Sequence, residues 1–143
     1  MKNKQVYLIG KMGGVPPEIY TKWRDDTSQQ LFCKLDDDRI NLTVICPNEF
    51  FGFEEKLHDN MMEIIQWELN EVKKSDVCIA NLDFDNSTGS NIEIHTAWLH
   101  NIPVLAYQPL YRRQHPWIEQ FVTRTFQDWD KLYEYISYYH LNV

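Results

Sequence analysis

The amino-acid sequence predicts an α/β fold with one mainly parallel sheet of four or five strands and helices on both faces. Two observations predict this fold. Short runs rich in β-branched and aromatic residues alternate along the chain with longer segments of helical periodicity. The runs at 77–82 and 103–107 are also almost continuously apolar, as is typical of strands buried on both faces of a parallel sheet. The 143 residues suit a single domain over 1–143.

The first half of the chain contains two predicted strands and two predicted helices. The first strand is ended by Gly10 and the second by Pro47, two residues that interrupt β-structure. The second helix places Met61, Ile65, Leu69 and Val72 on one face, which we expect to be buried. In order, we expect strand 5–9, loop 11–17, helix 17–32, turn 35–38, strand 40–46, a loop at 48–56 with three phenylalanines, and helix 58–74.

The second half repeats the alternation. We expect strand 77–82, a helix over about 90–100, strand 103–107, a helix near 117–123 and a last helix from about 127. The last helix has an apolar face formed by Trp129, Leu132, Tyr133, Ile136 and Tyr139. This organisation is of the Rossmann or flavodoxin-like kind. In such sheets ligands bind beyond the carboxyl ends of the strands, where loops 10–17, 83–90 and 108–116 should converge.

Composition and charge exclude several classes of function. Lys and Arg number 14 against 21 Asp and Glu, so the net charge of −7 disfavours binding to nucleic acid polymers or anionic membranes. No apolar run reaches transmembrane length and no signal peptide is recognisable, so we expect a cytoplasmic protein. Three widely spaced cysteines and unpaired histidines predict neither a disulfide framework nor a metal site, and Cys46 and Cys78 should be core residues.

Segment 75–98 is the most informative part of the chain. It contains an apolar strand, an acidic turn, a Ser/Thr/Gly loop and the start of a helix in which Glu93 lies. Ser90 and Glu93 have the spacing of a capping box, and the local pattern alone favours this reading. A carboxylate beside a small-residue loop could also be a nucleophile, since a helix N-terminus favours its ionised form.

Two loops carry residues that suit anion binding. Gly10, Gly13 and Gly14 follow the first strand with Lys11, and their amides could approach an anion, although a tight turn explains them equally well. Ser87 and Gly89 precede a helix and could contact a phosphate or a sugar hydroxyl.

Other polar candidates have a structural alternative beside the functional one. Asp83 and Asp85 end the third strand, where Asp usually serves the turn, yet they could contact a base or a hydroxyl. Tyr7 is by default a core aromatic residue. Arg112 and Arg113 are either a solvated pair or a phosphate contact.

Three motifs in order resemble the nucleoside 2-deoxyribosyltransferase superfamily, which includes the 2′-deoxynucleoside 5′-monophosphate N-glycosidases. The motifs are YLIGKMGG, WELNEVKKSDVCIANLD, and STGSNIEIHTAW before PVLAY, and the resemblance covers roughly residues 5–107. The resemblance implies that Glu93, in the family's G-x-x-x-E-[IL] pattern, is the nucleophile. It implies that Tyr7 orients Glu93, and that Glu68, at the position of a family Asp, contacts the base or assists its protonation.

The resemblance further implies cleavage or transfer at the N-glycosidic bond of a 2′-deoxynucleoside or its 5′-monophosphate, through a covalent deoxyribosyl–Glu93 intermediate. It implies no metal or organic cofactor, a small-molecule nucleoside or nucleotide as partner, and a homodimer or higher homo-oligomer. Ser87, where transferases often carry Asp, and the Gly13-Gly14 loop favour an alternative, a nucleotide N-glycosidase that acts as a hydrolase. A third alternative is a non-catalytic nucleotide binder, because His95 replaces a family glycine and places bulk near the nucleophile.

Overall fold

The structure, a computed structural model, describes residues 1–50 and 59–143 of the chain. All five strands of its sheet are parallel, in the order β2-β1-β3-β4-β5. This is the strand order of flavodoxin-like folds, in which the connections reverse direction between β1 and β3. The strands are β1 (Lys2–Gly10), β2 (Ile40–Ile45), β3 (Val77–Asn81), β4 (Val104–Tyr107) and β5 (Arg124–Phe126).

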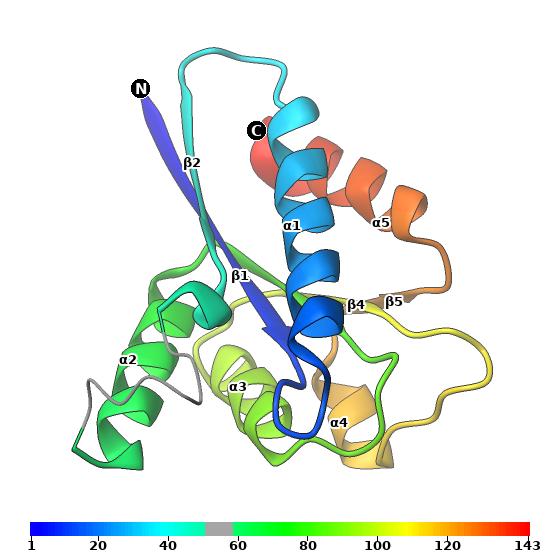
Figure 1. Cartoon of the computed structure of the whole chain (residues 1–143). Coiled ribbons are helices and arrows are strands. Elements are labelled where there is room, and N and C mark those ends of the chain that lie inside the picture. The colour runs from blue at the N-terminus through cyan, green and yellow to red at the C-terminus, as the bar shows by residue number, and fades with distance from the viewer. Residues whose placement is uncertain (51–58) are drawn as a thin grey trace.

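Helices cover both faces of the sheet (Figure 1). Alternate residues of β1 define the two cores, because successive side chains of a strand point to opposite faces. Val6 and Leu8 pack with α1 and α5, whereas Tyr7 and Ile9 pack with α2, α3 and α4. The helical elements are α1 (Pro17–Cys33), η1 (Pro47–Glu49), α2 (Met61–Lys74), α3 (Thr88–Leu99), α4 (Pro116–Phe121), α5 (Trp129–Ile136) and η2 (Ser137–Leu141).

The predicted α/β fold with a parallel sheet is confirmed, and every predicted strand and helix outside the undescribed segment exists. β1 is longer than predicted, and β5 lies in a stretch for which no element was predicted. The last helix begins at Trp129, where Asp128 caps it by accepting a hydrogen bond from the Asp130 amide. The predicted 48–56 loop and the predicted helix start at residue 58 fall partly outside the described residues.

Two predicted buried faces are partly wrong. On α2, Val72 is fully buried, but Met61 and Ile65 are 56% and 41% exposed. Among the described residues, the helix therefore packs against the core through its middle and its carboxyl-terminal end, where Trp67 and Val72 lie. At the end of the chain Tyr139 is 57% exposed and Leu141 is buried instead. The π-helical turn η2 explains this difference, since its wider turn changes which residues face inward.

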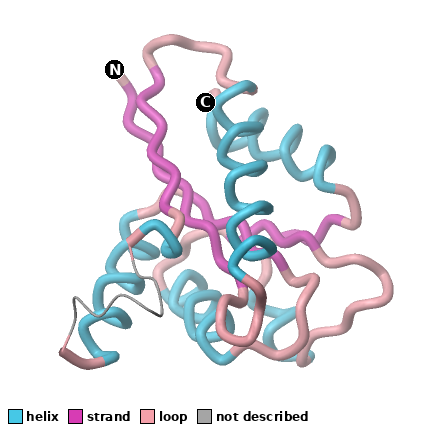
Figure 2. Tube along the Cα trace, in the orientation of Figure 1, coloured by secondary structure: helices cyan, strands magenta, loops and turns pink. Residues whose placement is uncertain are grey.

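The cysteines behave as expected, because Cys46 and Cys78 are buried in the core with free thiols. Within the described ranges, no helix combines the length and the apolar character needed to span a membrane. Figure 2 shows the loops that follow β1, β3 and β4 gathered at the carboxyl edge of the sheet, as predicted. This edge positions the candidate site.

Candidate active site

The candidate site lies where the strand connections reverse, between β1 and β3. Tyr7 comes from β1 and pairs in register with Cys78 of β3. Glu93 comes from α3, the helix that follows β3, and Glu68 comes from α2, which packs beside it. In open α/β sheets ligands bind beyond the carboxyl ends of the strands, and Tyr7 lies three residues before the end of β1 at Gly10. The fold therefore brings together the three residues that the family resemblance singles out.

Glu93 is a buried carboxylate, which is rare for a glutamate unless it is paired. Its residue is 8% exposed, and Oε2 has no hydrogen-bond partner within the described part of the chain. An unpartnered buried acceptor costs about 1–3 kcal/mol, and more when it is charged. A folded protein retains such a group for a purpose other than stability, and function is the usual one.

The electrostatics of the Glu68–Glu93 pair favour one shared proton near neutral pH. Burial raises the pKa of Glu93 to about 8, with a further increase from the charge of Glu68 and opposing effects of Tyr7 and Arg24. Burial also raises the pKa of Glu68 to about 7, while the charge of Arg24 lowers it. Because each ionised carboxyl disfavours ionisation of the other, the pair should carry a single negative charge at neutral pH.

Tyr7 is completely buried beside this pair. Burial raises the pKa of its phenol far above the usual value, and the charges of Glu93 and Glu68 add to the effect, so it stays protonated. Its hydroxyl is close enough to favour the ionised form of Glu93 as a hydrogen-bond donor would. However, neither Tyr7 Oη nor Glu93 Oε2 has a partner with hydrogen-bond geometry among the residues described. The two groups are thus adjacent without a fully formed hydrogen bond.

Arg24 on α1 is a site residue that the sequence analysis missed. It is 1% exposed and lies within charge-interaction range of both Glu68 and Glu93. Its guanidinium donates hydrogen bonds to the carbonyls of Tyr20 (2.7 Å) and Gly10 (2.9 Å). The available signal was its position: Arg24 occupies an inward-facing turn of α1 with the buried Thr27 and Leu31.

The predicted capping box at Ser90 and Glu93 is wrong. Helix α3 begins at Thr88, and its N-cap is Ser87, whose hydroxyl accepts a hydrogen bond from the Ser90 amide (3.3 Å). Because the helix starts earlier than predicted, Ser90 occupies the N3 position and Glu93 lies in the second turn. There the Glu93 side chain enters the core instead of reaching back to the helix start.

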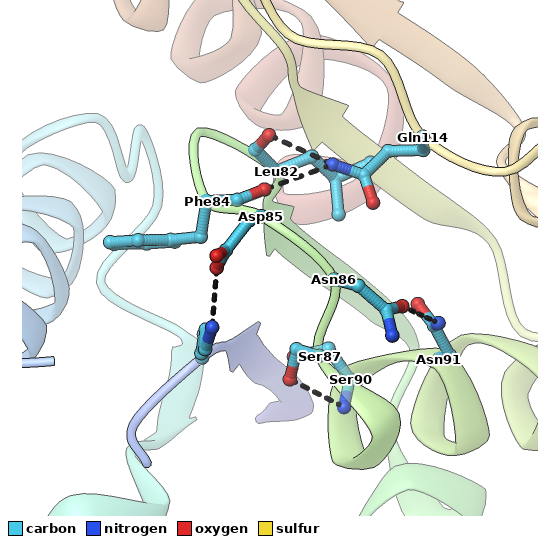
Figure 3. A network of polar contacts seen from close by, with 9 residues as sticks. Leu82, Phe84, Asp85, Asn86, Ser87, Ser90, Asn91 and Gln114 are labelled. Atoms are coloured by element: carbon cyan, nitrogen blue, oxygen red, sulfur yellow. Dashed lines mark hydrogen bonds and ion pairs between the residues drawn. The ribbon is translucent and has the colours of Figure 1, made fainter. Parts of the chain in front are cut away.

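The loops beyond the strands are tied to one another by polar contacts. Asp85 forms an ion pair with Lys11 of the loop after β1. Gln114 donates to the carbonyls of Leu82 and Phe84, both at 3.2 Å, as Figure 3 shows. Between these loops and the start of α3 remains a cavity of about 10 Å³, which holds one water at most.

Asp83 is held by two residues of the 108–115 loop. It accepts hydrogen bonds from the Tyr111 hydroxyl (3.0 Å) and from Arg112 Nε (3.3 Å). Arg113 is exposed. Asp83 and Asp85 therefore serve to join loops in this structure, and a contact to a base or sugar hydroxyl stays a prediction for both.

The glycines at this edge differ in their structural role. Gly10 is required by packing, because a Cβ there would lie 2.4 Å from Cζ2 of Trp23. Gly14 has a φ of +77°, which favours glycine. A Cβ on Gly13 or Gly89 would meet no atom within 4 Å in the described structure. The space on the Cβ side of the last two glycines is open, and their role in binding stays a prediction.

His95 does not crowd the candidate nucleophile, contrary to the expectation from sequence. It is exposed and packs against Phe121 and Trp98, with ring centroids 5.0 and 6.0 Å away. Two positions separate it from Glu93 on α3, and this spacing turns the two side chains to different sides of the helix. Among the described residues, no cluster of His, Cys, Asp or Glu could hold a metal ion.

No protein-family model and no curated protein matches the sequence, but solved structures match the fold. A 2-deoxyribosyltransferase from Bacillus psychrosaccharolyticus is 19% identical over 92% of this chain and 91% of its own, with a TM-score of 0.71. A conserved protein from Enterococcus faecalis V583 is 20% identical over 94% and 98%, with a TM-score of 0.72. A CMP N-glycosidase from Clostridium botulinum is 14% identical over 95% and 100%, with a TM-score of 0.54. At these identities the likeness shows the fold, which is the α/β fold with a parallel sheet that the sequence predicted.

Proposed function

We propose that the protein cleaves the N-glycosidic bond of a 2′-deoxynucleoside or its 5′-monophosphate and transfers the deoxyribosyl group to a second base. One observation carries the proposal: the Glu93 carboxylate is buried near Tyr7 and Glu68, and its Oε2 has no hydrogen-bond partner among the described residues. Structures of similar fold include a 2-deoxyribosyltransferase and a CMP N-glycosidase, which support the same class of substrate.

The shared proton of the carboxyl pair supplies the two roles that the first step needs. Ionised Glu93 attacks the anomeric carbon and forms an ester, while the bond from that carbon to the base nitrogen breaks. Protonated Glu68 gives its proton to the leaving base. Tyr7 and the positive charge of Arg24 oppose the effect of burial on the pKa of Glu93. The free protein holds its proton more readily on Glu93 than on Glu68, so the proposed reaction requires the proton to move to Glu68 when substrate binds.

The second step reverses the first. A nitrogen of the acceptor base attacks the anomeric carbon, the ester bond to Glu93 breaks, and Glu68 takes up the proton that the acceptor loses. Two displacements at one carbon restore its configuration, so the product keeps the anomeric form of the substrate. With water in place of the base, the same steps release free deoxyribose.

A nucleotide hydrolase is the second candidate, and one observation favours it. Lys11 and Ser87 line the same small cavity, which lies at the N-terminus of α3. A cation, a hydroxyl and the unpaired amides of a helix N-terminus suit a 5′-phosphate. To bind there, the phosphate must displace Asp85 from Lys11. The loops must also separate to admit a substrate, since Glu93 is only 8% exposed.

Product analysis tests these functions directly. The protein is incubated with each deoxynucleoside and each 5′-monophosphate, with and without a free acceptor base, and the products are separated by chromatography. Base exchange identifies a transferase, and sugar or sugar phosphate release without exchange identifies a hydrolase. A covalent adduct on Glu93, detected by peptide mass spectrometry and absent from Glu93→Gln, completes the test.

Two other results would contradict the proposal. A substrate that raises the melting temperature without turnover would indicate the non-catalytic binder. Cleavage by Glu93→Gln at the wild-type rate would exclude the mechanism while leaving the activity.

The homo-oligomeric state and the cytoplasmic location stay predictions. The exposed Met61 and Ile65 of α2 and the half-exposed Trp98 of α3 form apolar surface that a second copy could cover. Light scattering of the purified protein measures the mass that decides the first of these predictions.

A further inference from the structure

Arg24 is buried in a way that needs an explanation. Its residue is 1% exposed, although arginine is almost never fully buried without a partner. Two of its nitrogens donate to backbone carbonyls, whereas Nε has no partner within the described residues. One of those carbonyls belongs to Gly10, the last residue of β1, so Arg24 joins α1 to the strand that carries Tyr7.

The environment of Arg24 contains the carboxyls of the candidate site. Among the described residues, the titratable groups that act on it are Glu93 from α3, Cys46 after β2, Tyr7 from β1 and Glu68 from α2. Burial lowers the pKa of the guanidinium and the charge of Glu93 opposes this. Since a guanidinium cannot be deprotonated in a protein, the site holds a permanent positive charge.

The same charge acts on both carboxyls. The positive charge of Arg24 lowers the pKa of Glu93 and that of Glu68, against the effect of burial. Without this charge, the pKa of both carboxyls would rise further. A nucleophilic carboxylate must be ionised, so the site would be less active at neutral pH.

We propose that Arg24 is a positioning residue of the candidate site, which ties the end of β1 to α1 and provides a buried positive charge for the Glu68–Glu93 pair. The effect of Arg24 on the two carboxyls does not depend on which reaction the protein catalyses. Only the expected effect of Arg24 on turnover rests on the proposed function.

The experiment measures carboxyl titration and turnover in the same variants. Protein labelled with ¹³C at glutamate carboxyls is titrated by NMR, with Glu68→Gln and Glu93→Gln used to assign the signals. In Arg24→Gln, the titrations of both carboxyls should move upward by about one pH unit. The acidic limb of the kcat/KM profile should move in the same direction. Arg39→Gln is the matched control, since Arg39 is an exposed arginine beside Asp37 at the opposite edge, and should change neither readout.

Arg24→Lys decides the case if Arg24→Gln does not fold. A buried lysine ordinarily loses its proton near neutral pH. Facing Glu68 and Glu93, the introduced ammonium should keep its proton above pH 8, as read from its ¹⁵N signal. Deprotonation below pH 7, or carboxyl titrations unchanged in Arg24→Gln, would overturn the inference. If the titrations shift while the wild type cleaves no nucleoside or nucleotide, the proposed function fails and the role of Arg24 in ionisation stands.

Discussion

Glu93→Gln should make the protein more stable and inactive at once. The carboxylate that we propose as nucleophile is buried beside another carboxyl, so folding must work against its ionisation. Glutamine has nearly the same shape and no charge to bury. The substitution therefore separates the energetic cost of the site from its chemical role.

The size of the effect follows from the pKa of Glu93, which rises from 4.5 to about 8 on folding. Between these values the native state binds more protons than the unfolded state, so stability is fully present below pH 4.5 and falls as pH rises toward 8. Each pH unit is worth about 1.4 kcal/mol, which makes the cost at pH 7 about 3 kcal/mol for an isolated group. Because Glu68 shares the proton, we expect Glu93→Gln to gain about 1–3 kcal/mol at pH 7.

The assay is urea unfolding of wild type and variant at pH 5 and pH 8. The stability difference should be small at pH 5 and should grow toward pH 8, while cleavage falls by at least about 1,000-fold at both. Glu134→Gln makes the same chemical change at an exposed position of α5 and should alter neither property. A stability difference that does not grow with pH would refute the assigned burial cost, and wild-type cleavage by Glu93→Gln would refute the nucleophile.

Three further predictions test other parts of the site. Tyr7→Phe removes a buried hydroxyl that has no hydrogen-bond partner among the described residues, so urea unfolding should show a stability change of less than about 1 kcal/mol. Steady-state kinetics should show a fall in kcat of about 10- to 100-fold. Gly10→Ala places a Cβ 2.4 Å from the Trp23 ring and should lower the free energy of unfolding in urea by about 1–3 kcal/mol. Gly13→Ala has open space around the new Cβ and should change that free energy by no more than about 0.5 kcal/mol. Equal losses of stability in the two variants would contradict the packing role of Gly10. Ser87→Ala removes the cap of α3 and should cost about 1 kcal/mol. If Ser87 also holds a 5′-phosphate, KM should rise for the monophosphate and not for the nucleoside, and equal KM changes would argue against that contact.

Local pattern was sufficient for the fold class and for most elements. The strand Val77–Asn81 is buried along its whole length, as its continuous apolar character predicted. Helix bounds within one to three residues followed from periodicity and from Gly and Pro. These signals arise within a few residues of chain, so a sequence displays them directly. The alternation of elements then places three loops at one edge without further information.

Features that depend on distant residues were not predictable in this way. The strand β5 has only three residues and exists because it pairs with β4. Met61 and Ile65 have helical spacing on α2, yet no element of the described chain covers them fully. Arg24 reads as an ordinary helix arginine until Gly10 and the two carboxyls are placed around it.

The sequence by itself determined an α/β chain with a parallel sheet and a set of polar residues at its carboxyl edge. Only the tertiary structure decided where the Glu93 side chain lies. Its position relative to Ser90 predicted a helix cap, but α3 begins earlier and turns the carboxylate into the core beside Tyr7, Glu68 and Arg24. The physical reason is that a cap depends on neighbours along the chain. The pKa of a buried carboxylate depends instead on groups brought to it from other strands and helices.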